Sequence, residues 1–369
     1  MPRRLIELPL LRRLKPGLYV HDEEALNAEP EVGLLDQPIT PVDAFFIRNN
    51  GALPEIDHSR DWTLTLDGEV ERPRAWTVEA LRERFETVTI AAVLECAGNG
   101  RSLFSPPTDG LQWRLGAVGC ARWTGVRLKD LLEHAGARPG AVYTAHHSPD
   151  RLIRDETRPA LSRGLPIAKA LSEETLVAFA MNGEPLPPLH GGPLRIVAPG
   201  FPGSAWQKWL SGITIRPVEH DGEKMCGTDY RMPVRPVLPG EPIDKSLFEV
   251  ITDMPVKALV TAPVEGFSVE VGGAVEIRGF AWSGTVPVAG VSLSSDGGAS
   301  WREAALEPGE GPFAWRRFRA RFVAEQAGPV TIIAQARDEA GNVQPLHEAQ
   351  WNPRGYCNNQ AQRVRGTAR

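Results

Sequence analysis

The residues with the clearest chemical potential lie in segment 94–101, Leu-Glu-Cys-Ala-Gly-Asn-Gly-Arg. The apolar, β-branched run 88–93 precedes it and is typical of a buried strand. A thiolate at a strand end, followed by conformationally permissive glycines, suits a soft ligand offered to a metal. Cysteine is also among the most buried residue types, so a packing residue at an ordinary turn explains Cys96 equally well. The segment alone leaves both interpretations open.

The four cysteines do not form a recognisable metal or redox motif. Cys96, Cys120, Cys226 and Cys357 lie far apart, without a CxxC pair or zinc-ligand spacing. One functional thiolate and three other cysteines is the simplest interpretation. A disulfide between two of the other three stays open.

Composition limits the class of protein. A chain of 369 residues is long enough for two or three domains, and 42% hydrophobic with 24% charged residues is typical of a globular protein. The net charge of -5 gives no basic field for nucleic acid. No apolar run approaches the ~20 residues of a membrane span. As written, the chain shows no signal peptide, which predicts a cytoplasmic protein, or a periplasmic one if an export signal has been trimmed.

The elements that must position Cys96 can be read from local patterns. We expect a strand over 62–68 that ends in an Asp-Gly turn, and helices over 77–85 and 128–135. Further strands are expected over 176–180 and 194–198. From about residue 251 onward, short alternating strands at 267–271, 275–279, 291–294, 318–322 and 330–334 predict a β-sandwich. The predicted division is an irregular N-terminal arm (1–40) that packs over the first domain, a catalytic domain (41–235), a proline-rich linker (236–250) and the sandwich (251–369).

Several ordered motifs resemble those of the sulfite oxidase family of molybdopterin-dependent oxidoreductases, in its haem-free bacterial form. Segment 94–101 resembles the molybdenum-ligand loop, and segment 45–50 (Phe-Phe-Ile-Arg-Asn-Asn) resembles the motif FF-x-RN-H/N. The pterin-binding core is matched by 180–187 and 190–195. Shorter matches follow at 208–210, at 229–231 and at Trp-Asn-Pro-Arg-Gly 351–355. The resemblance covers about residues 45–355.

The resemblance implies an α+β fold, with a mixed α/β catalytic domain followed by an immunoglobulin-like dimerisation domain. It implies that Cys96 binds molybdenum together with one molybdopterin. The residues implied to bind the cofactor are Phe46, Ile47, Arg48, Asn49, Asn50, Cys96, His190, Arg195, Ser204, Trp206, Gln207 and Lys208. Those implied to form the substrate pocket are Arg48, Arg101, Trp113, Tyr230 and Arg354. Guanidinium groups suit this pocket because their planar fork matches an oxyanion.

The activity implied is oxidation of sulfite to sulfate by a homodimer. No haem, flavin or NAD module is visible, so the expected electron acceptor is a separate protein such as a c-type cytochrome. Another sulfur oxyanion, a sulfane or a sulfoxide remains an alternative substrate. Outside the family, a hydrolase with Cys96 as nucleophile and a histidine base, or a binding protein built on the sandwich, stays open. The family motif often ends in histidine where this chain has Asn50, which puts one pterin contact and the setting of Arg48 in question.

Overall fold

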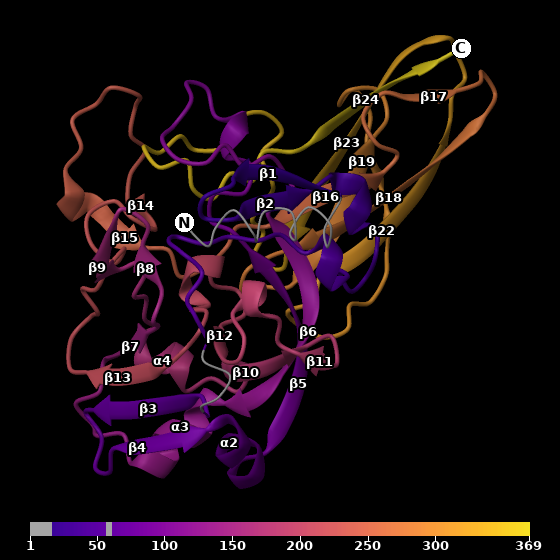
Figure 1. Cartoon of the computed structure of the whole chain (residues 1–369). Helices are drawn as coiled ribbons and strands as arrows, with labels where there is room; N and C mark the ends of the chain where they lie inside the picture. Colours follow the sequence, from indigo (N-terminus) through magenta and orange to yellow (C-terminus); the bar gives the residue numbers. More distant parts are fainter. Residues whose placement is uncertain (1–16, 57–60) are drawn as a thin grey trace.

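The fold is α+β, with many strands and few helices. The computed structural model describes residues 17–56 and 61–369. A mixed α/β part carries the first strands and the helices, and an all-β part follows it in the chain and lies at one end of the molecule (Figure 1). This agrees with the fold class expected from the sequence.

Two sheets build the mixed part. The first has the order β11–β10–β6–β5, with β12 also paired to β10. Its strands are β5 (Thr87–Glu95), β6 (Val118–Arg127), β10 (Leu176–Met181), β11 (Glu184–Pro185) and β12 (Arg195–Val197). The second has the order β4–β3–β13–β7, from β3 (Thr63–Gly68), β4 (Arg74–Thr77), β7 (Tyr143–His147) and β13 (Gly212–Arg216). The strand expected before Cys96 is therefore β5, whose last residue is Glu95.

The helices form where the local signals place them. Helix α2 (Val78–Arg84) begins after Thr77, whose side chain accepts a hydrogen bond from the Ala80 N–H. Helix α3 (Leu128–Ala135) ends at Gly136, which adopts a left-handed φ of 72° that glycine tolerates best. A single helical turn, α4 (Ile167–Ala170), precedes β10. Both longer helices were predicted from sequence.

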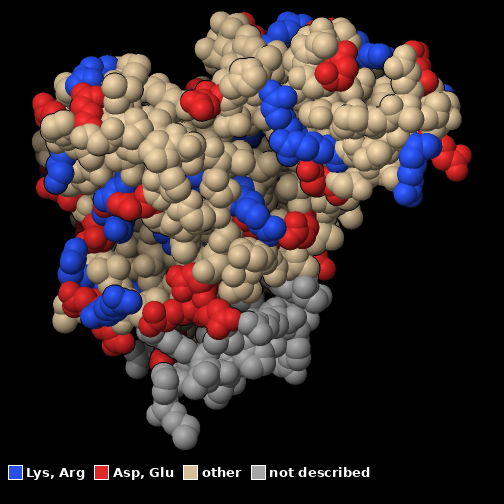
Figure 2. Space-filling model, turned by 90° about the horizontal axis from the view of Figure 1, so that it is seen from above, with Lys and Arg blue, Asp and Glu red and all other residues tan. Residues whose placement is uncertain are grey.

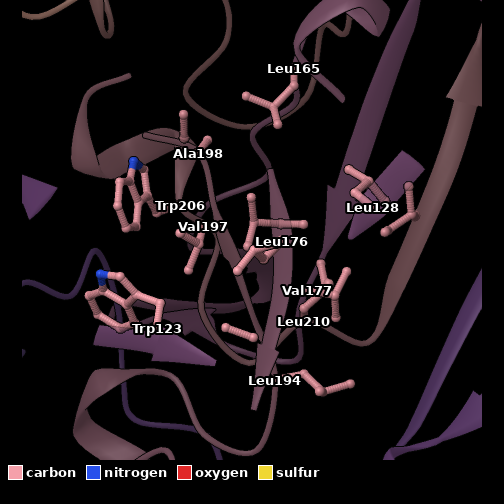
Figure 3. Packing of buried hydrophobic residues seen from close by; sticks show 14 of the residues in the cluster. Trp123, Leu128, Leu165, Leu176, Val177, Leu194, Val197, Ala198, Trp206 and Leu210 are labelled. Carbon is pink, nitrogen blue, oxygen red and sulfur yellow. The ribbon is translucent and has the colours of Figure 1, made fainter. Parts of the chain in front are cut away.

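The core of the mixed part lies between its sheets and around two tryptophans. Trp123 on β6 and Trp206 meet edge to face, with ring centroids 5.6 Å apart. Buried aliphatic side chains from β10, β12 and α3 continue the cluster (Figure 3). The loop that carries Trp206 is thus anchored in the core.

The described part of the N-terminal segment departs from the irregular arm expected from sequence. It forms a hairpin of β1 (Leu18–Asp22) and β2 (Asn27–Pro30). Beyond the hairpin, Asp36 binds Arg278 and Arg317 of the all-β part at 2.9 and 2.8 Å. The segment therefore contacts both parts of the chain, because its polar side chains find partners that no local pattern reveals. The first 16 residues of the predicted arm lie outside the described residues.

A small ladder closes the proline-rich stretch. Strands β14 (Arg231–Pro233) and β15 (Phe248–Val250) pair antiparallel at its two ends. Between them the chain makes one short turn of 3-10 helix, Lys245–Leu247. A second small ladder, β8 (Arg151–Leu152) with β9 (Asp155–Pro159), lies between β7 and α4 in the chain.

The all-β part is a sandwich of two sheets around its own apolar cluster. The order β16–β18–β22–β21 comprises Lys257–Ala262, Ala274–Trp282, Arg316–Val323 and Ala305–Leu306. The order β17–β24–β23–β19–β20 comprises Phe267–Val269, Arg363–Ala368, Gly328–Asp338, Val288–Ser294 and Arg302–Glu303. Five of these strands were predicted, whereas β16, β24 and the two-residue strands β20 and β21 were not.

Two further findings concern the whole described chain. All four cysteines are free, so the disulfide left open by the sequence does not form. Within residues 17–56 and 61–369, no helix has the length and apolar character needed to cross a membrane.

Candidate functional site

One cavity gathers most of the residues singled out from the sequence. It has a volume of about 650 Å³, counting its open mouth, and lies in the mixed part of the fold. The predicted residues that line it are Phe46, Arg48, Asn49, Asn50, Cys96, His190, Arg195, Ser204, Trp206, Gln207, Lys208 and Tyr230. The fold thus brings together segments that are as much as 184 positions apart, Phe46 to Tyr230.

Cys96 lies directly after β5, in a tightly fixed turn. Its N–H donates to the Ala117 carbonyl at 2.9 Å, and its own carbonyl accepts from the Asn99 N–H at 2.9 Å. The backbone of Gly203 approaches from the other side, where an added Cβ would lie 3.1 Å from the Glu95 carbonyl. Cys96 is only 7% exposed, and burial raises the pKa of its thiol, while the charges of Arg48 and Arg101 act in the opposite direction.

Asn50 joins two groups that face the cavity. The Arg48 guanidinium donates to Asn50 Oδ1 at 2.8 Å, and the Tyr230 hydroxyl donates to the same oxygen at 3.3 Å. Tyr230 has a left-handed φ of 51° and stacks on Tyr356 at a centroid distance of 5.2 Å. The asparagine therefore orients an arginine and a phenol toward one space.

The hairpin orders the neighbouring asparagine. Asn49 donates through its backbone N–H to Asn27 Oδ1 at 2.7 Å and through its side chain to the Ala25 carbonyl at 2.8 Å. Lys208 Nζ donates to Asn49 Oδ1 and to the Leu189 carbonyl. Lys208 is thereby held at the wall of the cavity, with its ammonium 4.4 Å from the centre of the Trp209 ring.

Arg195 is a buried cation that donates its hydrogen bonds to neutral backbone carbonyls. Its guanidinium donates to the carbonyls of His190 and Trp206 at 2.7 and 3.1 Å and lies 4.9 Å from the Trp123 ring centre. Burial lowers the pKa of Arg195 to about 9. Backbone carbonyls only partly offset the desolvation of a buried charge, so an anion in this cavity would be favourable.

Ser204 provides a test of whether an anionic cofactor fits. Its side-chain oxygen is buried at the cavity wall, and no hydrogen-bond partner is found for it among the described residues. Buried hydroxyls are almost always paired. Ser204, Arg195 and Lys208 together suit a phosphate, and the thiol of Cys96 suits a soft metal. The residues present therefore fit a phosphorylated, metal-carrying cofactor.

Four predicted residues do not line the cavity. Ile47 is buried and pairs its backbone with Ala28 of the hairpin. Trp113 is buried beside Phe46, with ring centroids 6.4 Å apart. Arg101 donates to the carbonyls of Arg354 and Leu111.

Arg354, the fourth of these residues, is half-exposed close to the cavity. It binds Asp229 at 2.9 Å and Thr228 at 3.0 Å, beside Tyr230 in the chain. Its main chain accepts the hydrogen bond from Arg101, so the end of the sandwich does fold back to this region. Its guanidinium, however, is engaged by a carboxylate rather than turned into the cavity.

Two charged residues of this region were missed by sequence reasoning. Asp150 lines the cavity; burial raises its pKa, and the Ser148 hydroxyl donates to it. Arg163 is buried against the Tyr230 ring at 5.0 Å and donates to the Lys224 carbonyl. Neither belongs to a recognisable motif, since Asp150 follows β7 in an ordinary Ser-Pro-Asp turn.

Comparison with known proteins assigns the family. Residues 50–224 match the oxidoreductase molybdopterin binding domain, and residues 248–367 match the Mo-co oxidoreductase dimerisation domain. Sulfite oxidase of Arabidopsis thaliana is 34% identical over 95% of this chain and 93% of its own length. Mitochondrial sulfite oxidase of Rattus norvegicus is 35% identical over 95% of this chain, which spans only 65% of the rat protein.

A solved structure agrees over nearly the whole chain. The sulfane dehydrogenase SoxCD from Paracoccus pantotrophus superimposes with a TM-score of 0.77 at 25% identity, covering 96% of this chain and 88% of that one. The family expected from the motifs is therefore confirmed. The chain belongs to the sulfite oxidase family of molybdopterin oxidoreductases.

Proposed function

We propose that this protein oxidises sulfite to sulfate with a molybdenum cofactor bound in the cavity. The observation that carries the proposal is the composition of the cavity wall. A single thiol, Cys96, shares it with three cationic side chains, Arg48, Arg195 and Lys208. This combination suits a soft metal and a small dianion at the same place.

The residues that would hold the cofactor follow from their chemistry. The Cys96 thiolate would bind the metal, and Ser204, Arg195 and Lys208 would bind the phosphate of the pterin. Asp150 accepts hydrogen bonds when ionised, so it would pair with N–H groups of the pterin ring. When bound, the cofactor supplies oxygen-atom transfer and takes up two electrons.

The chain itself would bind and orient the substrate. Arg48 presents a guanidinium that donates to the side-chain oxygens of Asn27 and Asn50 and to the backbone carbonyl of Asn49, all of them neutral. Such a group gains from a dianion in a partly dry cavity. The Tyr230 hydroxyl, held by Asn50, would donate to an oxygen of sulfite or of water.

The predicted role of the more distant arginines becomes indirect. Arg101 would contribute positive charge near Cys96, and it holds segment 354–356 through the Arg354 carbonyl and the Tyr356 ring. Arg354 would attract the anion at the entrance. Trp113 would keep Phe46 in place rather than touch the substrate.

Electrons must leave the site after each turnover. Sulfite and water yield sulfate, two protons and two electrons, and we propose that an external one-electron acceptor such as a c-type cytochrome takes the electrons in two steps.

We also propose that the sandwich pairs two copies of the chain, in line with its match to a dimerisation domain. On the face shown in Figure 2, acidic and basic side chains are interspersed, without a continuous field of one sign.

A sulfane is the second candidate substrate. The observation that favours it is the structural agreement with a sulfane dehydrogenase over most of both chains. Binding of sulfite would depend on the positive charge of Arg48 in the cavity wall. Binding of a sulfane sulfur that is carried on another molecule would depend instead on access through the mouth of the cavity.

Steady-state kinetics on metal-replete protein test the proposal. Sulfite should reduce ferricyanide and cytochrome c, with about one molybdenum per chain by elemental analysis. A protein that contains molybdenum but oxidises only a sulfane donor would favour the second candidate. A chain that binds neither molybdenum nor pterin would refute both.

A further inference from the structure

The residue before Cys96 is a fully enclosed carboxylate. Glu95 is the last residue of β5, and its side chain is 1% exposed. It accepts hydrogen bonds from Lys257 Nζ at 2.6 Å, Trp282 Nε1 at 2.7 Å and Asn99 Nδ2 at 2.9 Å. Glu95 does not line the cavity, so the cofactor assignment leaves it without a role.

Two of these three donors come from the sandwich. Lys257 begins β16, and Trp282 ends β18, in neighbouring strands that pair at these two residues. The Lys257 side chain is 3% exposed, and its ammonium lies 5.9 Å from the centre of the Trp282 ring. A buried ion pair depends on both partners, because either charge left alone keeps its full desolvation penalty. The second part of the fold therefore fixes the carboxylate of the first.

The same turn is held from two further directions. Asn99 accepts a hydrogen bond from the Ala117 N–H at 3.2 Å while its amide donates to Glu95, so it spans the turn that contains Cys96. The Cys357 N–H, from the end of the sandwich, donates to the Ala97 carbonyl at 2.8 Å. Residues on both sides of Cys96 are thus bound to the sandwich.

We propose that Lys257 and Trp282 are positioning residues for Cys96, and that the sandwich shapes the metal-ligand turn within its own chain. The inference rests on the proposed role of Cys96 as metal ligand. Glu95 and Ala97 flank Cys96, so the direction of its Cα–Cβ bond depends on how both are held. If Lys257 is lost, the Glu95 carboxylate would move toward water or another donor, and this movement would change the orientation of Cys96. Partners of this indirect kind typically change metal affinity or activity by about 10–100-fold when removed.

The first test compares Lys257→Met with the double variant Lys257→Met/Glu95→Gln. The single variant should lower the molybdenum content per chain or shift the thiolate-to-metal absorption and the Mo(V) EPR signal, with kcat reduced by roughly tenfold or more. The double variant removes the unpaired charge but keeps an acceptor for the Trp282 N–H. It should restore most of the molybdenum content and of the wild-type spectra. Trp282→Phe removes one N–H donor to Glu95 and keeps an aromatic ring at this position. It is a milder perturbation of the same carboxylate and replaces Lys257→Met as the test if that variant does not fold.

A matched control removes another buried cation that joins the sandwich to the rest of the chain. Arg317→Met breaks the ion pair with Asp36 at 2.8 Å, which shares no hydrogen bond with Glu95, and should leave molybdenum content and spectra unchanged. Wild-type metal content, spectra and kcat in both Lys257→Met and Trp282→Phe would overturn the proposal. The same loss in Arg317→Met would overturn it too, since the effect would then reflect general loosening. Metal content and spectra are measured without substrate, so a wrong assignment of sulfite would be seen separately, as an inactive but normally loaded wild-type protein.

Discussion

Replacing Arg48 and Arg101 by glutamine should separate substrate binding from support of the fold. Arg48 lines the cavity and donates to the side-chain amides of Asn27 and Asn50, which can rearrange when the guanidinium is lost, and to the backbone carbonyl of its neighbour Asn49. Arg101 is buried and donates to two backbone carbonyls, those of Arg354 at 2.9 Å and Leu111 at 2.8 Å. The carbonyls have no such freedom, because the chain on either side is fixed.

The magnitudes follow from the hydrogen bonds involved. One charged hydrogen bond is worth about 1.5–3 kcal/mol, so Arg48→Gln should raise KM for sulfite on the order of 10- to 100-fold, with a smaller change in kcat. In Arg101→Gln, the shorter side chain can satisfy only one of the two carbonyls. The Leu111 carbonyl still accepts from the Trp113 N–H at 2.9 Å, so the Arg354 carbonyl is the one that can lose its donor. That loss costs about 1–3 kcal/mol of unfolding free energy and lowers Tm by roughly 1–4 °C for a chain of this size. Its lost charge should raise KM as well.

The assay combines two measurements on each variant. KM and kcat come from ferricyanide reduction at fixed ionic strength, and Tm comes from circular dichroism on the same metal-replete preparations. Arg48→Lys is the control, because it keeps the charge and should recover part of the affinity. An unchanged KM in both glutamine variants would remove these arginines from substrate binding. A loss of Tm in Arg48→Gln as large as in Arg101→Gln would refute the distinction between them.

Four further outcomes are expected. Cys96→Ser should abolish turnover and leave the circular dichroism spectrum unchanged, because a hydroxyl is a harder and more basic ligand than a thiolate; normal sulfite oxidation would show that Cys96 is not the ligand. Arg354→Ala should raise KM less than Arg48→Gln does, because Asp229 already engages its guanidinium; a wild-type KM would leave Arg354 without a part in binding. Light scattering on the intact chain should give a dimer, and removal of residues 251–369 should give a monomer with low molybdenum content; a monomeric intact chain at micromolar concentration contradicts the proposed pairing. Burial and the nearby Arg216 charge lower the pKa of His220 to about 4. On acidification the unfolded chain takes up a proton near pH 6.5, whereas the native state binds it only near pH 4. The free energy of unfolding therefore decreases as the pH is lowered from about 6.5 to 4. Between pH 7 and 5.5 this histidine should account for about 1 kcal/mol, and urea titrations of His220→Gln should show a loss smaller by that amount; an identical pH dependence would exclude His220 as the source.

Local patterns were sufficient for much of the fold. The apolar run before Cys96 predicted β5. Thr77 caps the N-terminus of helix α2, and Gly136 caps the C-terminus of helix α3, as expected for these residue types. Strands β16 and β24 and the short strands β20 and β21 escaped prediction. Strand β16 is buried along nearly its whole length, so its sequence lacks the polar alternation that identified its neighbours.

The motifs likewise identified most of the cavity wall, because the chemistry of thiol, guanidinium and ammonium groups is carried by residue type. Residue type does not say where a side chain finds its partners. Arg101 and Arg354 were expected to face the substrate, yet neither lines the cavity: Arg101 donates to the Leu111 and Arg354 carbonyls, and Arg354 binds Asp229. Asp150 and Arg163 were overlooked because no local motif marks them.

The sequence by itself determined the family, the presence of a thiol at position 96 and the succession of a mixed part and a sandwich. Those properties depend on residue types and on spacings of a few positions. Tertiary structure decided which charges meet. Glu95 and Lys257 are 162 positions apart, and no periodicity relates β5 to β16. They become partners because the sandwich places its first strand against the end of β5, where a carboxylate removed from water needs a cation.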